Sequence, residues 1–229
     1  MADTKKLVVV AGATGRAGSL IVKEALKQGY RVRALIVPAV DPPDLPGLKE
    51  PGVALAEGSL ESAASLEKVM EGADYMISAI GSKKPFSSRE NDKVDNIGNQ
   101  NLVRAAKAKG LKHAVVISSI GVGNSRNAIM WLYRVAMGPV LNAKEKSENF
   151  IRSCGIGYTI IRPGGYSSDP LPNDIAFGEG GKITGRITRE QIARVCVDAL
   201  TNPVMKNRTL EVVNGTTVKE ERRQFVIKL

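Results

Sequence analysis

The chain has 229 residues, of which 43% are hydrophobic, so its length and composition suit one α/β domain with a sizeable buried core. Two cysteines and one histidine are too few for a disulfide framework, a zinc site or a Ser-His-Asp triad, so we expect no metal and cysteines that serve packing. The formal net charge is +10, but the basic residues are spread along the chain, so we expect no nucleic-acid partner.

Apolar, β-branched runs alternate along the chain with longer amphipathic segments. The predicted strands are residues 7–10, 32–37, 53–56, 75–79, 114–118, 158–161 and 209–213. The predicted helices are residues 16–28, 61–70, 92–109, 140–153 and 189–201. This alternation predicts a parallel sheet with helices on both faces, for which a Rossmann-type doubly wound topology is simplest. We expect residues 1–229 to form a single domain.

Two segments depart from this rhythm. Residues 38–51 contain five prolines and cannot form a helix or a central strand. Residues 167–185 are rich in glycine, proline and aspartate. Together with their flanks, residues 163–187, they are a candidate loop region on the substrate side, although a loop of this length can also be simply mobile.

A glycine pattern follows the first predicted strand. Residues 12–18 read G-x-x-G-x-x-G between a strand and a helix, the context that a dinucleotide-binding loop requires. Gly12 would permit the tight turn, Gly15 would let the backbone approach a pyrophosphate, and Gly18 would allow close helix packing. The helix N-terminus would offer free N–H groups and its positive dipole end to the phosphates. The sequence therefore predicts a nicotinamide dinucleotide site.

The end of the second strand normally indicates which dinucleotide binds. An acidic residue there bonds the ribose hydroxyls of NAD, but this chain has Ile36, Val37 and Pro38. Without an acid to repel a 2′-phosphate, we expect NADP, with NAD still possible. Arg16 could pair with that phosphate or could be an ordinary solvent-facing residue of the first helical turn.

Four segments carry a family resemblance: Gly12–Gly18 (GATGRAG), Tyr30–Leu35 (YRVRAL), Val116–Gly121 (VISSIG) and Tyr158–Gly165 (YTIIRPGG). They resemble the atypical short-chain dehydrogenase/reductase group, in particular its NmrA-like, biliverdin-reductase-B-like and plastid Tic62-like NAD(P)-binding members. The similarity extends from about residue 6 to residue 214.

The resemblance implies a cofactor role for residues along the chain. The pyrophosphate would be held by Gly12, Ala13, Thr14, Gly15, Arg16, Ala17 and Gly18. Ser59 and Leu60 would lie beside the adenine, Ser78, Ala79 and Ile80 would line the ribose, and Lys144, Pro163 and Gly164 would contact the nicotinamide end. Val37, after the second strand, and Ser118, after the fifth, complete the expected set.

Three positions depart from the family pattern. Many relatives have arginine where this chain has Val37, and aspartate where it has Ser59. Four residues before Lys144 stands Val140, so the Tyr-x-x-x-Lys pair of ordinary short-chain dehydrogenases is absent. In that pair the ammonium lowers the pKa of the phenol, which then transfers a proton to a carbonyl oxygen. Valine cannot do this.

Three residues are candidates for catalysis. Ser119 could hydrogen-bond a substrate carbonyl, as could Ser118, or these serines could merely cap a turn. Lys144 would orient the nicotinamide ribose, or be a solvated lysine in a Lys-Glu-Lys run. Tyr166 follows the Arg-Pro-Gly-Gly motif and is a possible proton donor near the nicotinamide.

Two further side chains are assigned a structural role. Tyr133 is interpreted as a packing aromatic rather than a proton donor. Arg162 could clamp an anionic substrate, but the family's Arg-Pro-Gly is usually architectural, and that is the role we expect.

Two functions remain. The first is an NAD(P)H-dependent oxidoreductase that transfers hydride to a small carbonyl or conjugated substrate. The second is a sensor or scaffold that binds NAD(P) without turnover, which the missing Tyr-x-x-x-Lys pair favours. No apolar run approaches the roughly 20 residues that cross a bilayer, and no signal-peptide pattern is present, so we expect a cytoplasmic protein without a membrane span. The sequence leaves open whether it is a monomer or a dimer.

Overall fold

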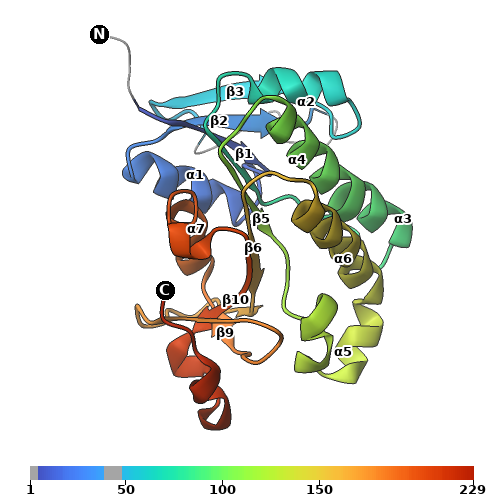
Figure 1. Cartoon of the computed structure of the whole chain (residues 1–229), viewed down its shortest axis with the longest axis vertical. Coiled ribbons are helices and arrows are strands. Elements are labelled where there is room, and N and C mark those ends of the chain that lie inside the picture. The colour runs from blue at the N-terminus through green and yellow to red at the C-terminus, as the bar shows by residue number, and fades with distance from the viewer. Residues whose placement is uncertain (1–4, 39–47) are drawn as a thin grey trace.

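The computed structural model describes residues 5–38 and 48–229, which build one large sheet covered by helices (Figure 1). The strands in spatial order are β3 (Val53–Glu57), β2 (Arg31–Ile36), β1 (Leu7–Ala11), β4 (Tyr75–Ser78), β5 (His113–Ile117), β6 (Tyr158–Pro163), β10 (Arg208–Asn214) and β8 (Ile175–Gly178). The first seven are parallel, and β8 pairs with β10 in the antiparallel sense. The predicted Rossmann-type α/β fold is confirmed.

Helices cover both faces of the sheet (Figure 1). One face carries α1 (Gly18–Lys27) and α7 (Arg189–Asp198), and the other carries α2 (Ala63–Met70), α4 (Asn99–Ala108) and α6 (Gly138–Ser153). Strand β1 shows why the fold takes this form. Val8 and Val10 pack on the face that α1 and α7 cover, whereas Val9 packs on the face that α2, α4 and α6 cover. A strand buried on both faces therefore reads as an unbroken apolar run.

Two predicted segments need correction. The expected loop at 167–185 contains β8, which pairs with β10, and it is flanked by a small second sheet of β7 (Gly165–Tyr166) and β9 (Arg186–Ile187). The strict strand–helix alternation is therefore wrong at this point. The expected helix 92–109 starts earlier, at α3 (Ser88–Asn91), and passes through a π-helical stretch, η1 (Asp92–Gly98), before α4.

The connection between β5 and α6 contains elements that were not predicted. They are the 3-10 helix η2 (Gly123–Ala128) and the short helix α5 (Trp131–Ala136). Three further 3-10 turns, η3 (Pro203–Met205), η4 (Gly215–Thr217) and η5 (Glu220–Phe225), flank β10 and end the chain. Most of the proline-rich segment 38–51 lies outside the described residues. Among the described residues, no helix is long and apolar enough to span a membrane.

Candidate cofactor and substrate site

The glycine loop after β1 is packed too tightly for side chains at two positions. Gly12 has a positive φ of 79°, and a Cβ there would lie 2.8 Å from the backbone of Ala79. A Cβ on Gly18 would overlap the carbonyl oxygen of Gly12. The Gly15 N–H donates to the same carbonyl at 3.0 Å, which closes the turn. The loop is thus held between the end of β4 and the start of α1.

The N-terminus of α1 begins directly after this turn. No side chain caps it, and its first turn contains no acidic residue. Its positive dipole end and backbone N–H groups therefore face no competing carboxylate from that turn, as an anion site requires. Arg16 is exposed beside it, where the sequence placed a possible phosphate partner.

The adenine side of the expected site is formed by two strand ends. Val37 is half-buried and Pro38 exposed after β2. Ser59 is exposed, and its turn is fixed because its N–H donates to the Ser65 hydroxyl at 3.1 Å. The Leu60 carbonyl accepts from the amide of Asn101 at 2.8 Å. Ser59 and Leu60 thus lie in a rigid turn ahead of α2.

The end of β4 lies beside the end of β1, where the order of the sheet reverses. The Ala79 N–H donates to the Ala11 carbonyl at 2.9 Å. Ser78 is buried, and its hydroxyl donates to Asn99 of α4 at 2.6 Å. That hydroxyl therefore points into the protein, and the half-buried Ala79 and Ile80 are the parts of this segment nearer solvent. Ligands in open α/β sheets bind in the crevice at such a reversal.

Lys144 of α6 forms a buried ion pair with Asp95 of η1. The Nζ–Oδ1 distance is 2.8 Å, with the Lys144 side chain 14% exposed and the Asp95 side chain fully buried. The second oxygen of Asp95 accepts from the Ser82 N–H at 3.0 Å. Lys144 is therefore not the solvated lysine that its Lys-Glu-Lys run allowed. That description fits Lys146, which pairs with Asp92 at the surface.

Asp95 was missed by the sequence analysis. Asp95 and Asn99 are four residues apart on one helical segment, and the Asn99 amide donates to the Asp95 backbone carbonyl at 3.0 Å. This spacing of a carboxylate and an amide ahead of an apolar helix was the available signal. The π-helical turn at Asp95 was not predictable from it, and such turns are frequent at functional sites.

Val140 occupies the position of the tyrosine in a Tyr-x-x-x-Lys pair. Its side chain is buried and packs with Val122 and Leu141. The position one helical turn before Lys144 thus faces the interior of this small cluster and carries no proton donor.

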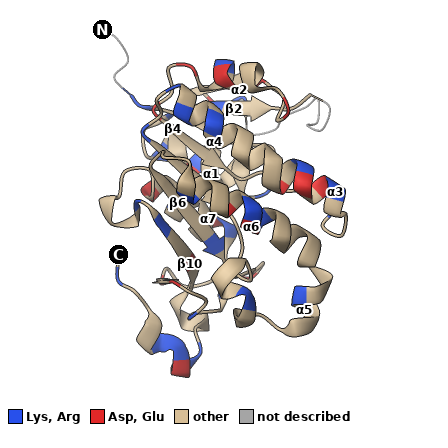
Figure 2. Ribbon diagram, turned by 45° about the vertical axis from the view of Figure 1, so that its right-hand side comes forward, with Lys and Arg blue, Asp and Glu red and all other residues tan. Residues whose placement is uncertain are grey.

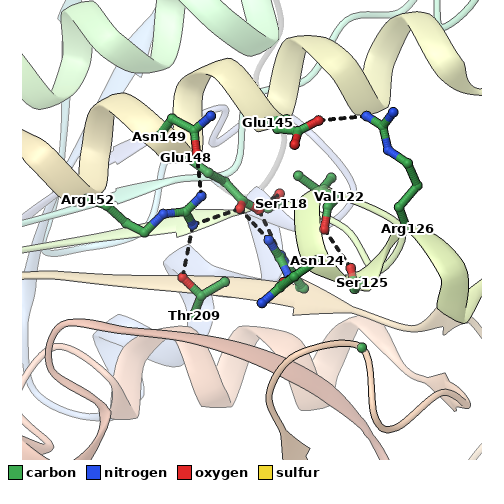
Figure 3. A network of polar contacts seen from close by, with 12 residues as sticks. Ser118, Val122, Asn124, Ser125, Arg126, Glu145, Glu148, Asn149, Arg152 and Thr209 are labelled. Carbon is green, nitrogen blue, oxygen red and sulfur yellow. Dashed lines mark hydrogen bonds and ion pairs between the residues drawn. The ribbon is translucent and has the colours of Figure 1, made fainter.

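The two serines after β5 have different surroundings. Ser118 is buried, and its hydroxyl donates to Glu148 at 2.6 Å (Figure 3). Ser119 is half-buried, and its hydroxyl donates to the adjacent Ile120 carbonyl at 2.9 Å. The Ser118 hydroxyl is therefore used by a buried partner. The Ser119 hydroxyl can exchange its bond to the Ile120 carbonyl for one to a ligand.

Ser118 belongs to a buried polar network centred on Arg162. The guanidinium donates to both oxygens of Glu148, at 2.9 and 2.6 Å, and to Asn124 at 2.6 Å. It also lies 3.5 Å from Glu211. Because Arg162 is 1% exposed, it cannot clamp a substrate from solvent, and the architectural role expected for it is confirmed.

The two carboxylates of this network are shifted in opposite directions. Burial works to raise the pKa of Glu148, but Arg162, followed by Ser118 and Arg152, holds it below its usual range. Burial raises the pKa of Glu211, because its contacts with Gly181 and Arg162 compensate less. One oxygen of Glu211 has no hydrogen-bond partner among the described residues.

The Arg-Pro-Gly-Gly segment ends β6 and packs against the end of segment 167–185. A Cβ on Gly164 would overlap the Gly185 carbonyl oxygen, and the Pro163 carbonyl accepts from the Ile120 N–H at 3.1 Å. Tyr166 follows on β7, 37% exposed, with its ring 4.4 Å from the Arg189 guanidinium. Burial of the rest of its side chain raises the pKa of Tyr166 to about 12, so the phenol keeps its proton at neutral pH. Ser119, Lys144 and Tyr166 thus come from three separate elements.

A cavity of about 620 Å³ lies between α1, α7 and residues 167–173. Its lining is charged and polar, with Lys27, Arg189 and Arg194 opposed by Glu24 and Glu190. It does not include the glycine loop or the three candidate catalytic residues. Residues 163–187 therefore do border a cavity, but this cavity is separate from the residues expected to take part in catalysis.

Three remaining expectations concern side chains away from the cofactor loop. Tyr133 is 51% exposed on α5, so its interpretation as a packing aromatic is wrong. Cys196 is fully buried and Cys154 partly buried, as expected for packing residues, and both are free thiols. In the described part of the chain, no group of three or more histidine, cysteine or acidic side chains could hold a metal ion.

Comparison with known proteins identifies relatives along most of the chain. It is 31% identical to the chloroplast protein TIC 62 of Pisum sativum, over 92% of this chain but 43% of that protein. It is 28% identical to sanguinarine reductase of Eschscholzia californica, over 93% of this chain and 91% of that enzyme. The resemblance to Tic62-like proteins is confirmed.

Solved structures share the fold at lower identity. The oxidoreductase ylbE of Lactococcus lactis superposes with a TM-score of 0.78 at 20% identity, covering 95% of both chains. The anaerobilin reductase ChuY of Escherichia coli O157:H7 gives 0.75 at 17%, covering 91% of this chain and 97% of that one. A short-chain dehydrogenase/reductase of Veillonella parvula in complex with NADP gives 0.74 at 18%, covering 93% and 97%.

The family model described as NAD(P)H-binding matches residues 12–203, from the first glycine of the loop to the turn before β10. The chain therefore belongs to the NAD(P)H-binding family, an oxidoreductase family with reductases among its members.

Proposed function

We propose that this protein is an NAD(P)H-dependent reductase of the atypical short-chain dehydrogenase/reductase type, acting on a small carbonyl or conjugated substrate. The observation that carries the proposal is the buried Lys144–Asp95 pair, whose carboxylate also accepts the N–H of Ser82, four residues after the end of β4. Burying an ion pair costs desolvation free energy, and we infer that this pair is retained because it fixes an ammonium beside the cofactor. Two relatives, sanguinarine reductase and ChuY, are reductases by name.

In this proposal the cofactor lies along the carboxyl ends of the strands. Residues 12–18 hold the pyrophosphate through backbone N–H groups and the end of α1. Val37, Ser59 and Leu60 border the adenine half, and Ala79, Ile80, Pro163 and Gly164 border the nicotinamide half. Ser78 and Ser118 support these walls from inside, since their hydroxyls bond Asn99 and Glu148. The reduced nicotinamide supplies the hydride when it is bound.

The side chains have separate tasks in the transfer. Lys144 donates a hydrogen bond to the nicotinamide ribose, and Asp95 fixes where the ammonium stands. Ser119 hydrogen-bonds the substrate oxygen or polar atom on which negative charge develops. The proton that completes the reduction comes from solvent or from Tyr166, whose phenol is protonated at neutral pH. No residue has to act as the tyrosine that Val140 replaces.

We further propose a preference for NADPH over NADH. It is supported by the absence of an acidic residue at Ile36–Pro38 and by the exposed Arg16 beside the loop. A 2′-phosphate would meet no carboxylate from these three residues and would gain a charge-assisted hydrogen bond from Arg16. The cytoplasmic location expected from the sequence also stays a prediction, which imaging of a fluorescent fusion would test.

The test is a screen in which flavins, quinones, tetrapyrroles and ketosteroids are offered as substrates and the oxidation of NADPH is monitored by its absorbance. The Gly15→Asp variant places a side chain and a negative charge against the pyrophosphate and should lose both turnover and calorimetric NADPH binding. Gly138→Asp is the matched control, because a Cβ at Gly138 meets no atom within 4 Å. Undiminished NADPH affinity in folded Gly15→Asp would refute the site.

A non-catalytic sensor or scaffold is the second candidate. The observation that favours it is Val140, buried where a catalytic tyrosine would stand. In that case NADPH binds and alters association with a partner protein, yet no compound in the screen is reduced. Turnover with any screened compound, lost in Gly15→Asp, would exclude this candidate.

A further inference from the structure

Helix α5 and the residue before it expose a group of large apolar side chains. Met130 is 74% exposed, Trp131 64%, Leu132 58%, Tyr133 51% and Val135 65%, and α5 has no buried residue. We call these five side chains the α5 surface. Figures 1 and 2 both place α5 at the lower end of the molecule, next to the start of α6. Single exposed apolar residues are common in proteins, but a contiguous group of this size marks an interaction surface.

The charge around the α5 surface has one sign. The chain contains no aspartate or glutamate between Asn96 and Lys144, whereas the β5–α6 connection contains Arg126 and Arg134. Figure 2 shows a basic position and no acidic one on α5. Arg126 is paired with Glu145 of α6, at 2.6 Å. Arg134 bonds only the neutral amide of Asn127 among the described residues, so its positive charge is not neutralised by a carboxylate there.

This combination matches an anionic lipid surface better than a two-fold contact with a second copy of the chain. In a two-fold contact between copies, α5 would face itself and bring Arg134 against its own equivalent with no acid on either side. A membrane instead offers phosphates to Arg134 and an apolar layer to Leu132 and Val135. Tryptophan and tyrosine are the residues that favour the boundary between these two layers.

We propose that the α5 surface docks the protein on an anionic lipid bilayer, peripherally, with Trp131, Leu132 and Val135 in the interface. The overall charge of +10 supports this through long-range attraction to the same surface. Docking does not depend on the proposed reductase activity. If both hold, the segment between Ser119 and Lys144 faces the bilayer, and the substrate is one that dissolves in lipid.

Trp131 is the only tryptophan of the chain, so its fluorescence reports on α5 alone. The full-length protein is mixed with vesicles of phosphatidylcholine or of phosphatidylcholine and phosphatidylglycerol in equal parts. We expect a blue shift of the emission and co-sedimentation with the anionic vesicles only. High salt should weaken both, because it screens the attraction.

Variants connect this binding to α5. The double variant Leu132→Ser/Val135→Ser keeps Trp131 as the fluorescent reporter. Each of its two changes should reduce the affinity for anionic vesicles by at least about tenfold. Val204→Ser, on a side chain 51% exposed on η3, is its control and should bind normally. Arg134→Glu should weaken binding, whereas the same charge reversal at the exposed Lys23 of α1 should have a smaller effect. Thermal unfolding by circular dichroism verifies that each variant is folded.

Three outcomes would overturn the proposal. The first is vesicle binding that the α5 variants leave unchanged, or no binding at all. The second is a blue shift that grows with protein concentration without vesicles, which would make the α5 surface an interface between copies. The third is a blue shift produced by NADPH with an apolar compound and absent with vesicles, which would make α5 a lid over the substrate.

Discussion

Lys144 and Asp95 form an ion pair, with 2.8 Å between Nζ and Oδ1, that ties α6 to the π-helical stretch η1. Asp95 has no exposed side-chain surface, and its second oxygen accepts the Ser82 N–H. Each partner has given up most of its water, and the attraction between the two charges compensates for that loss. The pair should therefore affect two quantities that can be measured separately. These are the unfolding free energy and the KM for the cofactor, which depends on where the ammonium is held.

Removing one partner of this pair should cost about 3–5 kcal/mol of unfolding free energy, because the other charge stays buried and unpaired. We expect this for Asp95→Asn and for Lys144→Met in urea unfolding. The double variant should lose less than the sum of the single variants. Both single variants should also raise the KM for the cofactor, because the ammonium is lost or no longer held in place.

Lys146→Met is the matched control for Lys144→Met. Its pair with Asp92 is largely exposed, with side chains 62% and 45% accessible, so the loss should be about 0–1 kcal/mol. Equal effects of the two lysine variants on stability and on KM would contradict the role of the buried pair.

The fold could be predicted where burial on both faces leaves a pattern in the sequence. The strand Val8-Val9-Val10 and the glycine turn after it are such local signals, and both lie where expected. Strand β8 could not be recognised, because it has four residues within a proline- and glycine-rich segment and ends on Gly178. Helix α5 could not be recognised, because it has only six residues and none of its side chains is buried.

The candidate site could be predicted only in part, for a similar reason. The glycine loop is contiguous in sequence, so its geometry can be inferred from spacing. The partners of Lys144, Ser118 and Arg162 lie on other elements, and no local pattern connects Lys144 with Asp95 or Arg162 with Glu148. Such pairs are set by how the helices pack on the sheet.

Arg16 should discriminate between the two dinucleotides. Arg16→Ala removes an exposed cation beside the glycine loop, and a charge-assisted contact to the 2′-phosphate is worth about 1.5–3 kcal/mol. We expect calorimetry to show NADPH affinity falling while NADH affinity changes little. Lys23→Ala, an exposed cation further along α1, controls for general charge loss. Equal losses for both cofactors would instead assign the 2′-phosphate to other residues, such as those of segment 38–51.

Glu211 should make the stability of the protein depend on pH in a defined direction. Burial raises its pKa above the ordinary 4.5, so the folded protein binds a proton more readily than the unfolded chain. The stability from this group is present below 4.5 and is lost as the pH rises through the folded pKa. Glu148, whose pKa is lowered, acts in the opposite sense and loses its contribution in acid.

Glu211→Gln removes the first effect and keeps the second. The unfolding free energy of the variant relative to wild type should therefore fall as the pH is lowered from neutrality through the raised pKa of Glu211 toward 4.5, because only wild type gains by protonation. Urea titrations across that range measure the difference. A constant difference between the two proteins would show that Glu211 has the same proton affinity folded and unfolded.

The last prediction concerns catalysis, once a substrate has been found. Ser119→Ala should chiefly lower kcat, by about 10²–10³-fold, because its hydrogen bond to the substrate strengthens in the transition state. Ser118→Ala is the matched control. Its hydroxyl bonds Glu148 in the interior, so the change should reduce stability with little effect on kcat.

Tyr166→Phe separates the two sources of the proton. If solvent provides it, kcat should fall only slightly, as it should for Tyr133→Phe on the exposed α5. If Tyr166 provides it, kcat should collapse while Ser119→Ala leaves turnover intact, and the assignment of the reacting hydrogen bond to Ser119 would be wrong. A phenol with a pKa of about 12 holds its proton across the neutral range, so a Tyr166-dependent step should show no loss of kcat on the alkaline side of neutrality that is attributable to Tyr166.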